Sequence, residues 1–237
     1  MSDHEQVHYQ HDIVRIADDY DKENIIEGNL TIPNTAIDTK GTVIFAHGSG
    51  SSRHSPRNQY VARVLNNAGI ATLLIDLLTK EEEKIDDITR EHRFNIRLLA
   101  RRLLASTDWL LQHAKLRNLS IGYFGASTGA AAALVAASEH PNTISAIVSR
   151  GGRPDLAGQE VLNHIQAPTL LIVGENDKQV IQLNEKALEQ LSRLEKKKKL
   201  VIVPGATHLF EEPGTLQEVA RLASGWFECF FLEKRKT

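Results

Sequence analysis

The feature that most constrains the fold is the stretch Leu119–Ala136, which reads LSIGYFGASTGAAAALVA. Its first residues, through Phe124, form a short apolar run that is typical of a buried strand. The alanines after Gly129 favour a helix strongly. One sharp turn, GASTG at 125–129, joins the two. Because so tight a turn brings the strand and helix backbones close together, a Cβ at either of its glycines would clash.

The turn has the pattern G-x-S-x-G. A strand before it and a helix after it are the context that the nucleophile-elbow motif requires. In that motif the serine, here Ser127, is held in a strained conformation with its Oγ projecting above the sheet. The alternative is a glycine-rich turn that only packs the helix onto the strand. An acid and a histidine further along the chain would decide between the two.

Composition limits the class of protein. The chain has 237 residues, of which 41% are hydrophobic and 24% are charged, and this suits one α/β domain over 1–237 with a loosely ordered segment at 1–11. A formal net charge of −2 gives no bulk field that would recruit nucleic acid or an anionic membrane. The histidines at 4, 8 and 11 lack further ligands at metal-binding spacing, so no metal site is expected there.

Location is predicted from what the sequence lacks. The polar start of the chain does not resemble a signal peptide, and no apolar run approaches the roughly 18 residues of a membrane span. A single cysteine, Cys229, rules out an internal disulfide framework and fits a reducing compartment. We therefore expect a cytoplasmic protein, either a monomer or a homodimer, without nucleic-acid or membrane partners.

Short apolar runs alternate with helical patterns along most of the chain. Strands are expected at 42–46, 70–75, 119–124, 143–149, 168–173 and 200–203, after an opening antiparallel hairpin of 12–16 with 25–32. Helices are expected at 55–67, 93–113, after Ser127, at 180–194 and at 215–232. This alternation predicts an α/β fold with a doubly wound, mainly parallel sheet and no large lid domain.

Some local expectations are specific enough to test. The charged segment 77–90 is expected to be a solvated surface loop. The arginines of the helix at 93–113 should face outward, and Cys229 should lie on or near the packed side of the last helix. The lysines at 196–199 are expected to form a solvated connection.

Three candidate catalytic residues, Ser127, Asp177 and His208, each follow an expected strand. Parallel strands end at the same edge of a sheet, so these residues can converge there. His208 would take the proton of the serine hydroxyl during attack, and Asp177 would orient the imidazole and stabilise the imidazolium. Two alternatives remain open: Asp177 could be only the N-cap of the next helix, and Asp76, also at a strand end, is a rival acid.

Negative charge that develops on a substrate oxygen needs fixed donors. One would be the backbone N–H of Thr128, the residue after the nucleophile, and the other should come from the His47–Gly50 loop, with the N–H of Ser49 as the candidate. His47 itself is expected to orient this loop rather than to transfer protons.

The motifs VIFAHGSG, GASTG, LLIVGEND and PGATH, in this order, resemble the α/β-hydrolase fold from about Thr42 onward. The compact chain resembles the dienelactone-hydrolase branch. Dienelactone hydrolases carry a cysteine nucleophile where this chain has Ser127, which makes a serine esterase more natural than a lactone-specific enzyme. The resemblance implies hydrolysis of a small carboxylic ester, thioester or lactone through an acyl-serine, without metal or organic cofactor. Acyl transfer on the same triad, or a catalytically idle binding module, are the alternatives.

Arginines follow two of the loops on the catalytic edge. Arg53 and Arg57 come after the His47–Gly50 loop at a helix start, and Arg150 and Arg153 follow the strand after the elbow. Arginines and helix N-termini bind anions, so the substrate could bear a carboxylate or a phosphate. The alternative is that Arg150 pairs with Asp155 and only locks its own loop.

Overall fold

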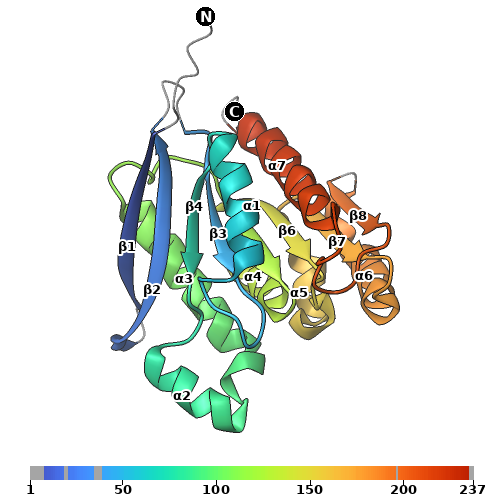
Figure 1. The fold of residues 1–237 in the computed structure, drawn as a ribbon, viewed down its shortest axis with the longest axis horizontal. Helices are drawn as coiled ribbons and strands as arrows, with labels where there is room; N and C mark the ends of the chain where they lie inside the picture. The colour runs from blue at the N-terminus through green and yellow to red at the C-terminus, as the bar shows by residue number, and fades with distance from the viewer. Residues whose placement is uncertain (1–7, 19–20, 35–38, 196, 235–237) are drawn as a thin grey trace, which may run out of the picture.

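The computed structural model describes residues 8–18, 21–34, 39–195 and 197–234. Within these residues one eight-stranded sheet has the order β1-β2-β4-β3-β5-β6-β7-β8 (Figure 1). Its strands are β1 His8–Asp18, β2 Asp21–Asn34, β3 Thr42–Ala46, β4 Ala71–Ile75, β5 Ile121–Ala126, β6 Ile144–Arg150, β7 Thr169–Gly174 and β8 Lys198–Val203. The helices are α1 Pro56–Asn67, α2 Lys80–Thr89, α3 Ile96–Gln112, α4 Thr128–Glu139, α5 Gln159–His164, α6 Lys178–Gln190 and α7 Thr215–Lys234.

Strand directions confirm the predicted α/β fold. β1 pairs antiparallel with β2, which pairs antiparallel with β4. From β4 to β8 every neighbouring pair is parallel. The central strands β3, β4 and β5 are buried along their whole length, as expected for strands covered on both faces. The carboxyl ends of the six parallel strands therefore meet at one edge, where the candidate residues lie.

Two hydrophobic cores lie on the two faces of the sheet. On one face, α1 and α7 pack over the strands through Val61, Leu65, Val219 and Phe227. On the other, α3, α4, α5 and α6 cover the sheet, with Leu103 and the alanines of α4 at the centre. The two layers are visible in Figure 1, where α1 and α7 lie in front of the strands. Alanines let α4 approach β5 closely, which is what the sharp turn between them requires.

The segment at 77–90 is predicted to be a surface loop. Instead it contains the helix α2. Thr79 and Glu82 form a complete capping box at its start, and this satisfies two of the N–H groups that a helix leaves free there. The expectation that arginines of the following helix face outward is wrong for Arg102. Its side chain is fully buried, and its guanidinium donates to Glu82 Oε1 at 2.7 Å.

Other differences are local. The helix expected at 93–113 is split into a short 3₁₀ turn, His92–Phe94, and α3. A second 3₁₀ turn, Pro154–Ala157, and the helix α5 occupy a connection in which no helix was expected, and a third turn, Ser192–Leu194, follows α6.

Predictions near the ends of the chain also need correction. Cys229 is exposed rather than packed. The strand β8 already begins at Lys198, so only part of the lysine run is a connection. β1 begins at His8, inside the segment predicted to be loose, and residues 1–7 lie outside the described part of the chain. No helix of the described residues is long and apolar enough to cross a membrane.

Candidate active site

The turn between β5 and α4 places Ser127 in a strained backbone conformation, with φ 50° and ψ −118°. The glycines beside it are required by close approach. A Cβ on Gly125 would lie 2.4 Å from the Cα of Ala130, and one on Gly129 would lie 2.4 Å from the carbonyl oxygen of Ala46. The turn is therefore as tight as the sequence pattern predicts, and it presents the serine at the edge of the sheet.

Neighbouring loops hold the elbow in place. The N–H of Ser127 donates to the carbonyl of Arg150 at 3.2 Å, and the N–H of Arg153 donates to the carbonyl of Ser127 at 3.1 Å. On its other side, Gly48 lies so close that an added Cβ would be 3.1 Å from the Cβ of Ser127. The serine is thus fixed between the loop after β3 and the loop after β6.

Asp177 and His208 form a direct pair across the ends of β7 and β8. The distance between Asp177 Oδ2 and His208 Nδ1 is 2.6 Å, and the Asp177 side chain is only 16% exposed. Asp177 occupies the N-cap position of α6, but its side chain makes no capping hydrogen bond. The carboxylate is therefore directed to the histidine, which answers the N-cap alternative raised by the sequence.

Glycines allow the loops that carry Asp177 and His208 to approach each other closely. A Cβ on Gly174, at the end of β7, would lie 2.4 Å from the carbonyl oxygen of Ala206. Gly151, with φ 52°, backs the imidazole of His208, and its Cβ would lie 3.4 Å from Nδ1 of that ring. With Nδ1 engaged by Asp177, Nε2 is the ring nitrogen left for a proton transfer.

The two candidate oxyanion donors lie beside Ser127. Thr128 is the first residue of α4, where backbone N–H groups have no intrahelical acceptor. Ser49 follows Gly48 and lines the same cavity as Ser127. In the described part of the chain neither N–H donates to another backbone group.

His47 is buried and makes two hydrogen bonds that tie the loop after β3 to the end of β4. Its Nε2 accepts from the N–H of Leu77 at 3.1 Å, and its Nδ1 lies 2.9 Å from the carbonyl oxygen of Gly48. Burial lowers the pKa of His47, which favours the neutral ring with a proton on Nδ1. These bonds fit an orienting role.

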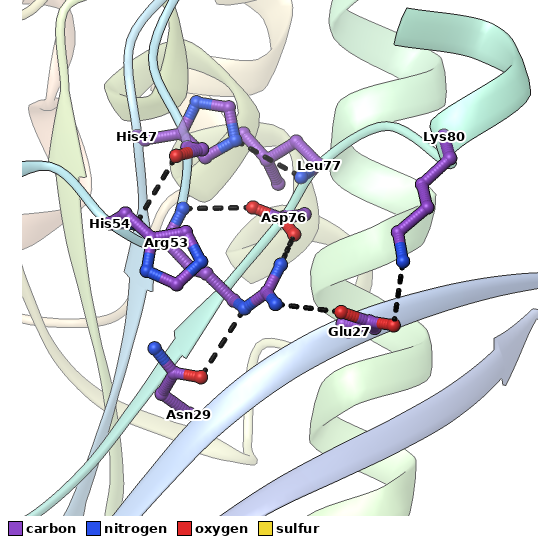
Figure 2. A network of polar contacts seen from close by, with 9 residues as sticks. Glu27, Asn29, His47, Arg53, His54, Asp76, Leu77 and Lys80 are labelled. Atoms are coloured by element: carbon purple, nitrogen blue, oxygen red, sulfur yellow. Dashed lines mark hydrogen bonds and ion pairs between the residues drawn. The ribbon is translucent and has the colours of Figure 1, made fainter.

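Arg53 does not line the cavity beside Ser127. Its guanidinium contacts the carboxylates of Asp76 and Glu27, the latter at 2.6 Å, and its Nε donates to Asn29 Oδ1 at 3.3 Å. Figure 2 shows this network, with the backbone N–H of Arg53 also donating to Asp76. Arg53 is therefore occupied by structural partners, and Asp76, the rival acid, pairs with Arg53 rather than with His208.

Arg150 and Arg57, in contrast, line a cavity of about 230 Å³ together with Ser127 and His208. Arg150 is only 7% exposed and lies over the ring of Phe210, 5.9 Å from its centroid. The expected alternative, a pair between Arg150 and Asp155, does not occur, because Asp155 pairs with Arg153 at 2.7 Å. Burial and the neighbouring charge of Arg57 lower the pKa of Arg150 to about 10, so it stays protonated at neutral pH.

Sequence inspection missed three residues around this cavity. Asn58 is buried in its wall, Glu211 pairs with Arg57 at 3.0 Å, and Phe210 adopts φ 56° beneath Arg150. The available sequence signal for Glu211 was the acidic pair Glu211–Glu212, which comes shortly after His208. In the residues described, no group of three or more His, Cys, Asp or Glu side chains is arranged to hold a metal ion.

The sheet topology and the elbow identify the chain as an α/β hydrolase. It matches the model of the dienelactone hydrolase family over residues 26–229, and it belongs to that family. A crystal structure of a dienelactone hydrolase from Anabaena variabilis ATCC 29413 is 58% identical, with a TM-score of 0.87, covering 94% of this chain and 98% of that one.

More distant structures share the fold alone. Est1E from Butyrivibrio proteoclasticus is 17% identical, with a TM-score of 0.73 over 95% of this chain and 99% of its own.

Two curated relatives from Mycobacterium tuberculosis strains, named "Putative phosphoribosyl transferase", are 55% identical over 202 residues, or 85% of this chain and 43% of each relative. The chain thus spans less than half the length of the curated relatives that it matches.

Proposed function

We propose that the protein is a serine hydrolase that cleaves a small carboxylic ester, thioester or lactone through an acyl-Ser127 intermediate. The observation that carries this proposal is the 2.6 Å pair of His208 Nδ1 with Asp177 Oδ2, on a histidine that lines one cavity with the strained Ser127. A paired, correctly oriented imidazole next to a serine is the arrangement that activates a hydroxyl nucleophile.

In the acylation step, Ser127 Oγ attacks the carbonyl carbon while His208 Nε2 takes the hydroxyl proton. The C=O electron pair moves onto the oxygen, where the N–H groups of Thr128 and Ser49 would stabilise the charge. The tetrahedral intermediate then collapses, and the bond to the leaving group breaks. The proton held by His208 passes to that leaving group, which departs as an alcohol or thiol or, in a lactone, stays attached to the acyl chain as a hydroxyl.

Deacylation repeats these events with water. His208 takes a proton from the water, whose oxygen attacks the acyl carbon, and the bond to Ser127 Oγ then breaks. The proton on His208 returns to the serine, and the carboxylic acid is released. Asp177 keeps the imidazole in one tautomer throughout and stabilises its cationic form.

One hydrogen bond of the proposed triad, between Ser127 and His208, is not formed among the residues that the structure describes. In the described part of the chain Ser127 Oγ makes no hydrogen bond with His208. Such bonds are often long without substrate and tighten in the reacting complex. The activity in the names of the mycobacterial relatives describes proteins about twice as long, so the hydrolase proposal rests on the site rather than on those names.

Intact-mass analysis after incubation with a fluorophosphonate tests the proposal. The wild type should gain one adduct that maps to Ser127, and the Ser127→Ala variant should gain none. A folded wild type that stays unlabelled would show that His208 does not activate Ser127, and would favour a binding module. Product analysis with an added acceptor alcohol then separates hydrolysis from acyl transfer.

A further inference from the structure

The cavity beside Ser127 has the lining of an anion site, and we propose that it binds a phosphate group carried by the substrate. The proposal rests on the serine hydrolase function, because the phosphate would hold the ester against Ser127. The substrate class would then be a short ester, thioester or lactone with a phosphate a few bonds from its carbonyl carbon.

Arg150 is the first reason. An arginine that is only 7% exposed is normally paired with a carboxylate, because burying an isolated charge is costly. Within the described residues Arg150 has no ion pair, and its Nε has no hydrogen-bond partner. The neighbouring charge of Arg57 has the same sign and lowers the pKa of Arg150 further. A ligand anion would relieve both the desolvation and the repulsion.

The rest of the lining is the second reason. Arg57 Nε, a donor, is also buried without a partner in the described part of the chain, and Arg57 lines this same cavity. Ser49, Ser51 and Ser55 add hydroxyl groups, and no carboxylate is among the lining residues. Ser55 caps the N-terminus of α1, whose dipole favours a negative group at that end.

Glu211 shows how the second arginine could be released. It pairs with Arg57 at 3.0 Å, but its own side chain is 64% exposed. Exposed pairs of this kind contribute little to stability and exchange readily. A phosphate could therefore displace Glu211 from Arg57. It would then bind the guanidinium groups of both Arg57 and Arg150, whereas Glu211 binds that of Arg57 alone.

The charge and the number of donors favour phosphate over carboxylate. Two guanidinium groups carry two positive charges, which a phosphate at −1.5 to −2 balances and a carboxylate does not. Three phosphate oxygens also match the arginines and serine hydroxyls better than two carboxylate oxygens do. A cavity of about 230 Å³ is smaller than the usual 300–1,000 Å³ of drug-sized ligand pockets, so the phosphate must lie close to the ester.

The test compares three 4-nitrophenyl esters of similar acyl length, ending in a methyl, a carboxylate or a phosphonate group, the last as a stable phosphate mimic. In the wild type, kcat/KM for the phosphonate ester should exceed that for the neutral ester by at least about 10-fold, with the carboxylate ester between them. Arg150→Met should reduce the phosphonate-to-neutral ratio by about 10-fold or more. Glu211→Gln should raise it.

Arg153→Met is the matched control, because this arginine pairs with Asp155 outside the cavity and its loss should leave the ratio unchanged. Equal ratios in the wild type and Arg150→Met, or a higher rate for the carboxylate than for the phosphonate ester, would overturn the proposal.

A binding measurement separates this proposal from the catalytic one. Titration of phenylphosphonate into the Ser127→Ala protein should show binding that Arg150→Met weakens by about 10-fold or more. Binding of equal strength with and without Arg150 would contradict the subsite even if Ser127 reacts with fluorophosphonate. If this binding depends on Arg150 but the wild type is not labelled by fluorophosphonate at Ser127, the phosphate subsite would be supported and the hydrolase proposal contradicted.

Discussion

Arg53 and Arg150 are both partly or fully buried arginines on the same edge of the sheet, yet their surroundings are opposite. Arg53 contacts two carboxylates and an amide oxygen, contributed by β2 and the end of β4. Arg150 has a positively charged neighbour, an aromatic ring and a cavity that also contains Ser127. One arginine is neutralised within the fold, whereas the other is not.

The difference shows that residue type and position do not distinguish an arginine that is paired within the fold from one that is left without an ion pair. What distinguishes them is the set of partners that the tertiary fold supplies. The Arg53 network ties the β1–β2 hairpin to the loop after β3 and should matter for stability. The Arg150 cavity should matter for substrate, and the two roles can be separated experimentally.

The largest difference in kcat is expected between variants of two aspartates, Asp177 beside the cavity and Asp76 in the Arg53 network. Asp177→Asn should lower kcat on a small ester about 10⁴-fold, because an amide can no longer fix the reactive tautomer of His208. Asp76→Asn, which affects the Arg53 network, should retain most of kcat. Ester hydrolysis by both purified variants measures this, with circular dichroism to confirm folding. A reversed order would make Asp76 the catalytic acid.

The arginines should differ in stability. Arg53→Met leaves Asp76 without this charged partner and Glu27 with only the exposed Lys80, and we expect a loss of about 2 kcal/mol, less than the 3–5 for a fully buried pair. For a chain of this size that lowers the unfolding temperature by roughly 4–8 °C. Arg150→Met removes a buried, uncompensated charge and should leave the temperature equal or higher. Thermal unfolding monitored by circular dichroism measures both, and equal losses would mean that the two arginines have the same role.

His47 beside Asp76 should give the Arg53 region a pH dependence. Its folded-state pKa is lowered from 6.5, so the unfolded chain binds the proton more readily. The stability contributed by neutral His47 is therefore complete above about pH 6.5 and is lost as the pH falls towards the folded-state value. The difference in unfolding free energy between wild type and His47→Gln should shrink from pH 8 to pH 5 in urea titrations. A difference that grows over this interval would contradict the neutral ring.

The smallest effect is expected at the outer end of the network. Lys80 pairs with Glu27 at 3.2 Å, but its side chain is 72% exposed. Lys80→Ala should change the unfolding free energy by no more than about 0.5 kcal/mol. Thermal unfolding of this variant beside Arg53→Met shows whether the stability of the network resides in its buried arginine, and similar losses in both would show that it does not.

The alternation of strands and helices and the positions of Ser127, Asp177 and His208 follow from local signals. Apolar runs mark the parallel strands, and each candidate residue comes directly after one. Helix α2 had its own signal, since Thr79 and Glu82 have capping-box spacing, but the charges around it suggested a loop. Arg102 was misplaced because its partner Glu82 belongs to that helix.

The roles of the arginines could not be predicted from sequence. Glu27 and Asp76 lie 26 and 23 residues from Arg53 and reach it only because β2 pairs with β4. Glu211 lies 154 residues from Arg57. Local patterns carry no information on such long-range pairs, which depend on strand order and on how neighbouring loops pack.

The backbone of Ser127 has a consequence for how such a chain evolves. A side chain at φ 50° costs about 1–3 kcal/mol, a cost that glycine at the same position would avoid. Selection for folding alone would therefore replace this serine with glycine, and a lineage that lost its chemistry would gain stability by doing so. In reconstructed ancestors or laboratory populations selected only for heat resistance, position 127 should be among the first to change.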